Sequence, residues 1–143
     1  MKTRTLLFTA MLSISGVSLA ASPIVHIYKR EGCGCCDLWA AHLEKHGLKT
    51  RANVVDEVSM IRGSTGIPEA LSSCHVATIG EYAIEGHVPA SAIKRLLKEK
   101  PKAVGLAVAG MPAGSPGMEA AGKVPYSVLL VLEDGSTRVF SRH

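Results

Sequence analysis

The hydrophobic pattern alternates between two periods along the chain. Short runs of β-branched and aromatic residues predict strands, and apolar residues that recur every three or four positions predict helices between them. The predicted strands cover 24–28, 49–55, 76–79, 82–84, 126–132 and 137–140, and the predicted helices cover 36–46, 57–62 and 89–100.

This order of elements predicts a single α/β domain. A strand, a cysteine-rich turn, a helix, a strand, a helix, a hairpin and a helix follow one another as in a thioredoxin-like domain. A Gly/Pro/Met-rich loop without periodicity is expected over 105–122, and a C-terminal β-hairpin follows it. We expect residues 21–143 to form this one domain, because the length suffices for one modest core and not for two.

The first 20 residues have the three parts of a secretory signal peptide. A basic start at 1–4 precedes an apolar run at 6–19, and Ser18 and Ala20 supply the small residues of a cleavage site. The alternative is an N-terminal membrane anchor, but the apolar run is short and interrupted by Ser and Gly. We therefore expect a signal peptide at 1–20, export to the periplasm, and no membrane span in the mature chain.

The charge excludes one class of partner. The formal net charge of +4 falls to +2 when Lys2 and Arg4 are removed with the signal. The remaining basic residues are scattered, with Lys94, Arg95 and Lys98 on one face of a predicted helix. Because no basic stripe with aromatic residues is present, we expect no nucleic-acid binding.

All four cysteines lie in the expected mature part, and three of them are crowded. Cys33, Cys35 and Cys36 share one turn, and Cys74 is distant. Only Cys33 and Cys36 could form a comfortable local disulfide, because closer neighbours bond only with strain. This crowding favours a redox-active pair or a metal site. A binding module stabilised by disulfides remains an alternative, but the spacing of the cysteines disfavours it.

Three chemical uses of the turn compete. Cys33 and Cys36 form a C-x-x-C pair, which in a thiol–disulfide oxidoreductase would attack and resolve, respectively. A third thiol beside such a pair invites scrambling, whereas it is an additional ligand for a metal. A zinc site would need four ligands converging on one ion, but crowded thiolates suit bridging between copper(I) ions. We therefore expect copper(I) on a multinuclear thiolate site. The partial positive charge at the N-terminus of the following helix would stabilise the thiolates.

Other residues are candidates for the same site. The segment entering the third strand is expected opposite the turn, which would bring Cys74 and His75 to it. His87 is a candidate imidazole ligand, and Met111 and Met118 are candidate thioethers in a loop with little apolar face to fill. His42 and His46 have chelating spacing, but we expect them on a solvated helix face.

Taken together, these motifs resemble the CopG-like family, long catalogued as a domain of unknown function and found among bacterial copper-resistance genes. The resemblance runs from Tyr28-Lys29 through the C-x-C-C turn, Ser73-Cys74-His75 and 85–89 to 111–119. It implies a periplasmic thioredoxin-like protein of copper tolerance that binds copper ions and handles their redox state. As partners we expect copper ions and another periplasmic copper-handling protein. It points to Cys33, Cys35, Cys36 and Cys74, and after them to His75, His87, Met111 and Met118.

Overall fold

The computed structural model describes residues 23–143. The expected signal peptide, residues 1–20, lies outside the described residues. The strands are β1 (Val25–Lys29), β2 (Thr50–Val54), β3 (His75–Ile79), β4 (Tyr82–Glu85), β5 (Gly105–Ala107), β6 (Ser127–Val131) and β7 (Thr137–Arg142). The helices are α1 (Gly34–Lys45), α2 (Val58–Thr65) and α3 (Ala90–Glu99), with short 3-10 turns η1 (Glu69–Leu71) and η2 (Glu119–Ala121).

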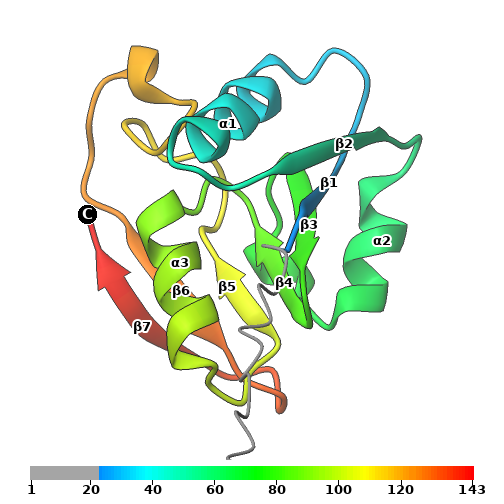
Figure 1. Cartoon of the computed structure of the whole chain (residues 1–143), viewed down its shortest axis with the longest axis vertical. Helices are drawn as coiled ribbons and strands as arrows, with labels where there is room; N and C mark the ends of the chain where they lie inside the picture. The colour runs from blue at the N-terminus through cyan, green and yellow to red at the C-terminus, as the bar shows by residue number, and fades with distance from the viewer. Residues whose placement is uncertain (1–22) are drawn as a thin grey trace, which may run out of the picture.

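Within residues 23–143 the seven strands form one mixed sheet (Figure 1). Its order is β2-β1-β3-β4-β5-β6-β7, with β1 parallel to β2 and β4 parallel to β5. The other neighbours are antiparallel, and β3 and β4 are joined by the expected two-residue turn at Gly80 and Glu81. The expected α/β class is therefore confirmed.

Helices cover both faces of the sheet. Trp39 and Leu43 of α1 and Ile93 and Leu96 of α3 pack on one face in the larger core cluster. A smaller cluster on the other face includes Ile67 and lies beside α2 and η1. Because neighbouring strand residues point to opposite faces, the end of each central strand can supply side chains to either layer.

The structure adds one strand that the sequence pattern did not predict. Residues 105–107 were expected in a loop, but they form β5 between β4 and β6. Gly105 permits this pairing, because a side chain at that position would collide with the backbone of Ala83. Three residues that begin with glycine carry too little periodicity to be identified as a strand.

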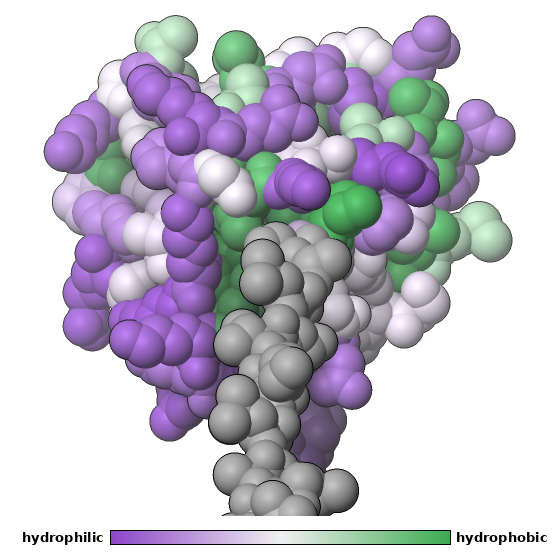
Figure 2. Space-filling view, in the orientation of Figure 1, coloured by the Kyte–Doolittle hydropathy of each residue, from purple (hydrophilic) through white to green (hydrophobic). Residues whose placement is uncertain are grey.

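The surface offers small hydrophobic areas. Hydrophilic residues predominate on the face shown in Figure 2, and hydrophobic residues appear in separate patches. The large apolar side chains exposed among the described residues are Leu38, Val54, Met60, Met111, Val124 and Val139. No helix within residues 23–143 is long and apolar enough to cross a bilayer.

Candidate metal centre

The crowded cysteines lie where β1 passes into α1. Cys33 is the N-cap residue of α1, and it forms a disulfide with Cys36, whose Cα is 5.4 Å away. Cys35 is a free thiol between them, with its sulfur 3.7 Å from that of Cys33. Gly32, at φ 71°, provides the reversal that brings the chain from the strand into the helix. The expected local pair is thus the one that forms.

Cys74 joins these three residues from the other side of the site. It directly precedes β3, and β3 pairs antiparallel with β1. Its sulfur lies 3.6 Å from both the Cys35 and the Cys36 sulfurs. The expectation that the start of the third strand faces the turn is confirmed, and all four sulfurs lie within 4.8 Å of one another.

His75 is buried directly behind Cys74. Its Nε2 lies 3.0 Å from the carbonyl oxygen of Gly86, which can only accept a hydrogen bond, so Nε2 carries the proton. Its Nδ1 therefore carries no proton and has a free lone pair, which can accept a hydrogen bond or bind a metal. This atom lies 3.4 Å from the Cys74 sulfur. The Trp39 ring packs on the imidazole with centroids 4.4 Å apart and restricts its rotation.

His87 is oriented in the same way by a different carbonyl. Its Nδ1 lies 2.7 Å from the carbonyl oxygen of Pro116, and its Nε2 points to the Cys74 sulfur at 3.2 Å. The single S–H of Cys74 can satisfy only one of the two imidazole lone pairs at a time. Cys74, His75 and His87 thus form a second donor group that shares Cys74 with the cysteine group.

The loop after β5 closes over His87. The segment from Pro112 to Met118 folds back on itself and lies beside α1 (yellow to orange in Figure 1). Gly117, at φ 87°, touches the helix so closely that a Cβ there would lie 2.7 Å from the Cys35 carbonyl oxygen. A side chain at this position would therefore push the loop, and with it the Pro116 carbonyl, away from His87.

Burial determines the protonation of the donors. Burial and the hydrogen bond with Cys35 raise the pKa of Cys74 to about 12. Burial, with the nearby His87, lowers the pKa of His75 to about 3, and burial also lowers the pKa of His87. At neutral pH both imidazoles are therefore neutral and able to bind a metal. The Cys74 thiol, in contrast, must lose its proton when it binds a metal.

The remaining candidates are placed less deeply. Met118 is half-buried on the loop that carries Pro116, and Met111 is 49% exposed. His46 is exposed, as expected. His42 is half-buried instead, because its Nε2 accepts the backbone N–H of Ala90 at the start of α3.

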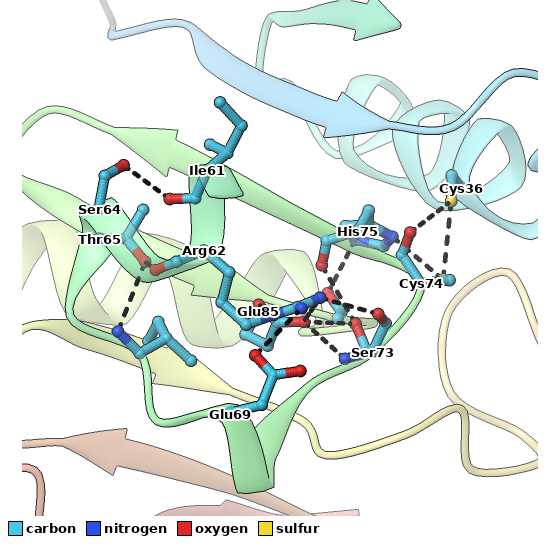
Figure 3. A network of polar contacts seen from close by, with 12 residues as sticks. Cys36, Ile61, Arg62, Ser64, Thr65, Glu69, Ser73, Cys74, His75 and Glu85 are labelled. Atoms are coloured by element: carbon cyan, nitrogen blue, oxygen red, sulfur yellow. Dashed lines mark hydrogen bonds and ion pairs between the residues drawn. The ribbon is translucent and has the colours of Figure 1, made fainter. Parts of the chain in front are cut away.

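Three supporting residues were not identified from the sequence. Trp39 was recognised only as part of an apolar stripe, yet its indole N–H donates to the Val88 carbonyl at 2.9 Å and its ring packs on His75. Arg62 and Glu85 form a buried ion pair beside Cys74 and His75 (Figure 3). Single charges within a helix and a strand gave no sequence signal for this pairing.

Comparisons with known proteins bear on this site. Residues 71–118, which contain Cys74, His75 and His87, match the model of the family described as "Protein of unknown function, DUF411". The chain is also similar to two solved structures described as "Copper resistance protein copG", Form 1 and Form 2. Each is 36% identical to it, with a TM-score of 0.80, and each match covers 85% of this chain and 98% of the other. A comparison with curated proteins finds no match.

Proposed function

The chain belongs to the family of the copper resistance protein copG, and from this premise we propose that it holds copper(I) for copper tolerance. The observation that carries the proposal is that four cysteine sulfurs and two imidazole nitrogens form two adjoining donor groups that share Cys74. Soft thiolate ligands suit copper(I), and imidazole is a normal copper ligand.

The arrangement supports a multinuclear site. Four sulfurs and two nitrogens exceed what a single copper(I) ion needs, and Cys74 belongs to both donor groups. Its thiolate would bridge ions held by Cys33, Cys35 and Cys36 to ions held by His75 and His87. Met118, and after it Met111, would add thioether ligands from the loop.

Copper loading requires the reduced protein. The Cys33–Cys36 disulfide offers no thiolate, so a dithiol reductant must first supply two electrons and two protons and become a disulfide itself. Copper(I) then displaces the thiol protons, including that of Cys74. When the metal leaves, the same two thiols can close the disulfide again: they release two protons, and one electron passes to each of two copper(II) ions, which become copper(I).

We assign the remaining features on the same premise. Residues 1–20 act as a signal peptide, and residues 21–143 function as one thioredoxin-like domain in the periplasm. The succession of β1, α1, β2, α2, β3, β4 and α3 supports this fold assignment. The mass of the exported protein tests the cleavage: it should begin at Ala21, and an intact Met1 would contradict the assignment.

The test of function is copper(I) competition. The reduced protein, residues 21–143, is titrated without air against a chromophoric copper(I) chelator, beside a variant with all four cysteines replaced by serine. The wild type should withdraw copper from the chelator and develop copper–thiolate absorption in the ultraviolet, and the variant should do neither. A wild type that leaves the chelator saturated would overturn the proposal.

A thiol–disulfide oxidoreductase is the second candidate. The observation that favours it is the Cys33–Cys36 disulfide at the start of α1, in the arrangement of a redox pair. In that reaction the Cys33 thiolate attacks a substrate disulfide, and Cys36 resolves the mixed disulfide and releases the reduced substrate. This role needs neither Cys35 nor the two imidazoles.

A further inference from the structure

A buried ion pair lies on the sheet face opposite α1. Arg62 of α2 donates from Nε to Glu85 Oε2 at 2.9 Å and from Nη2 to Glu85 Oε1 at 3.1 Å. Arg62 is 4% exposed and Glu85 is fully buried. The pair has no place in the copper ligand set, because both Glu85 oxygens are already engaged by Arg62 and Ser73.

Ser73 connects the ion pair to the first ligand segment, Cys74 and His75 (Figure 3). Its backbone N–H donates to Glu85 Oε1 at 2.7 Å, and its carbonyl accepts from Arg62 Nη2 at 2.9 Å. Its hydroxyl lies 2.9 Å from Glu85 Oε1 and 3.1 Å from the His75 carbonyl oxygen. Both main-chain groups of the residue before Cys74 are therefore fixed by the ion pair.

The second ligand segment is tied to the same place. The backbone N–H of Gly86, next to Glu85, donates to the His75 carbonyl at 3.2 Å, and the Gly86 carbonyl accepts from His75 Nε2. At φ 71° Gly86 leaves no room for a side chain, since a Cβ would lie 2.8 Å from the Ser73 hydroxyl. The direction of His87, the next residue, thus depends on the contact between these two strand ends.

From these contacts we infer that Arg62, Glu85 and Ser73 are positioning residues, which clamp the two strand ends so that Cys74, His75 and His87 converge on copper. This inference rests on the proposed function. Exchange of a buried ion pair for apolar residues is often neutral for stability, because desolvation offsets the attraction. The role of this pair is therefore to fix the positions of the ligand residues. Mutation of outer residues that orient metal ligands typically lowers metal affinity 10- to 100-fold.

Two variants test the inference. Ser73→Ala keeps both charges and removes only the hydroxyl. The double variant Arg62→Met with Glu85→Leu removes both charges together, so that neither is left buried alone. The copper(I) affinity of each reduced, folded variant should fall by about tenfold or more relative to wild type. Nitrogen NMR of the imidazoles in the metal-free protein should show altered His75 and His87 environments.

A control separates positioning from stability. Leu130→Ala leaves a cavity in the core and destabilises the fold, and it lies on β6, which pairs with β5 and β7 and not with β3 or β4. It should lower the unfolding midpoint and leave copper(I) affinity within about twofold of wild type, since distant sites behave independently.

The outcomes are distinct. Wild-type copper affinity in both test variants would overturn the inference, and so would an equal loss of affinity in Leu130→Ala, because affinity would then merely follow stability. A wild type that binds no copper would overturn the proposed function. Unchanged imidazole signals in the variants would contradict the clamp even in that case.

Discussion

At the scale of single residues, the orientation of two imidazoles distinguishes the site from a plain cysteine cluster. His75 and His87 each give one ring proton to a backbone carbonyl and turn the other nitrogen to Cys74. Carbonyls that fix the tautomer of a ligand histidine are a common feature of metal sites. The residues could be predicted from sequence as candidates, but their carbonyl partners could not, because Gly86 and Pro116 act through the backbone.

Replacement of Cys35 distinguishes the two candidate functions. Cys35→Ser leaves the Cys33–Cys36 pair intact but removes a sulfur that lies 3.6 Å from Cys74. In competition with the chelator, the variant should bind copper(I) about tenfold more weakly or hold fewer ions per chain. The rate of closure of the Cys33–Cys36 disulfide serves as the control for folding. Unchanged copper binding would favour the oxidoreductase.

Gly117 is a sharp test of the loop. Gly117→Ala should weaken copper(I) binding by about tenfold, because its Cβ would meet the Cys35 carbonyl and displace Pro116 from His87. Gly110→Ala is the matched control: it has the same left-handed backbone at φ 66° but no atom within 4 Å. The left-handed backbone should cost each variant about 1 kcal/mol of stability in urea unfolding, and Gly117→Ala should lose more than this because of its contact with α1. Equal copper affinities in the two variants would contradict the role of the loop.

At the scale of elements, the order and type of the longer segments could be predicted because their hydrophobic periods are clear. The strand β5 could not, since only the close approach of Gly105 to β4 makes it a strand. The position of Cys74 opposite the cysteine-rich turn could be predicted from the order of the strands and helices. The contacts of α2 with the site did not, because Arg62 looks like any charged residue on a surface helix.

Trp39 links α1 to the segment before α3. Trp39→Phe keeps an aromatic ring but leaves the Val88 carbonyl without the indole N–H at 2.9 Å. The free energy of unfolding should fall by about 1–3 kcal/mol, as for other buried groups that lose a partner. Urea denaturation followed by circular dichroism measures this. The neighbouring Leu38→Ala, at a 60% exposed position, should change the free energy of unfolding by less than about 0.5 kcal/mol. An equal loss in the two variants would contradict this role of the indole hydrogen bond.

At the scale of the whole molecule, the buried histidines make the fold sensitive to acid. The pKa of His75 is about 3 in the folded protein and 6.5 in the unfolded chain, so between these values the unfolded chain binds more protons. The metal-free protein should therefore lose stability as the pH falls from about 6.5, by on the order of 1 kcal/mol per pH unit for this residue. The lowered pKa of His87 acts in the same direction.

Urea midpoints at pH 7, 6 and 5 measure the effect. The variant His75→Gln supplies the comparison, because it lacks the titrating group. Its midpoint should depend less on pH than that of the wild type. Parallel curves for the two proteins would show that His75 titrates normally in the fold.

The most direct test of the proposed copper centre is the metal content together with the thiol count of the protein. The protein is purified without air from copper-supplemented cells and is alkylated before and after removal of the metal. We expect more than one copper ion per chain, and four cysteines that react only after the metal is removed. Metal-free protein with a reversible Cys33–Cys36 disulfide, and with Cys35 and Cys74 free to react, would contradict the proposal.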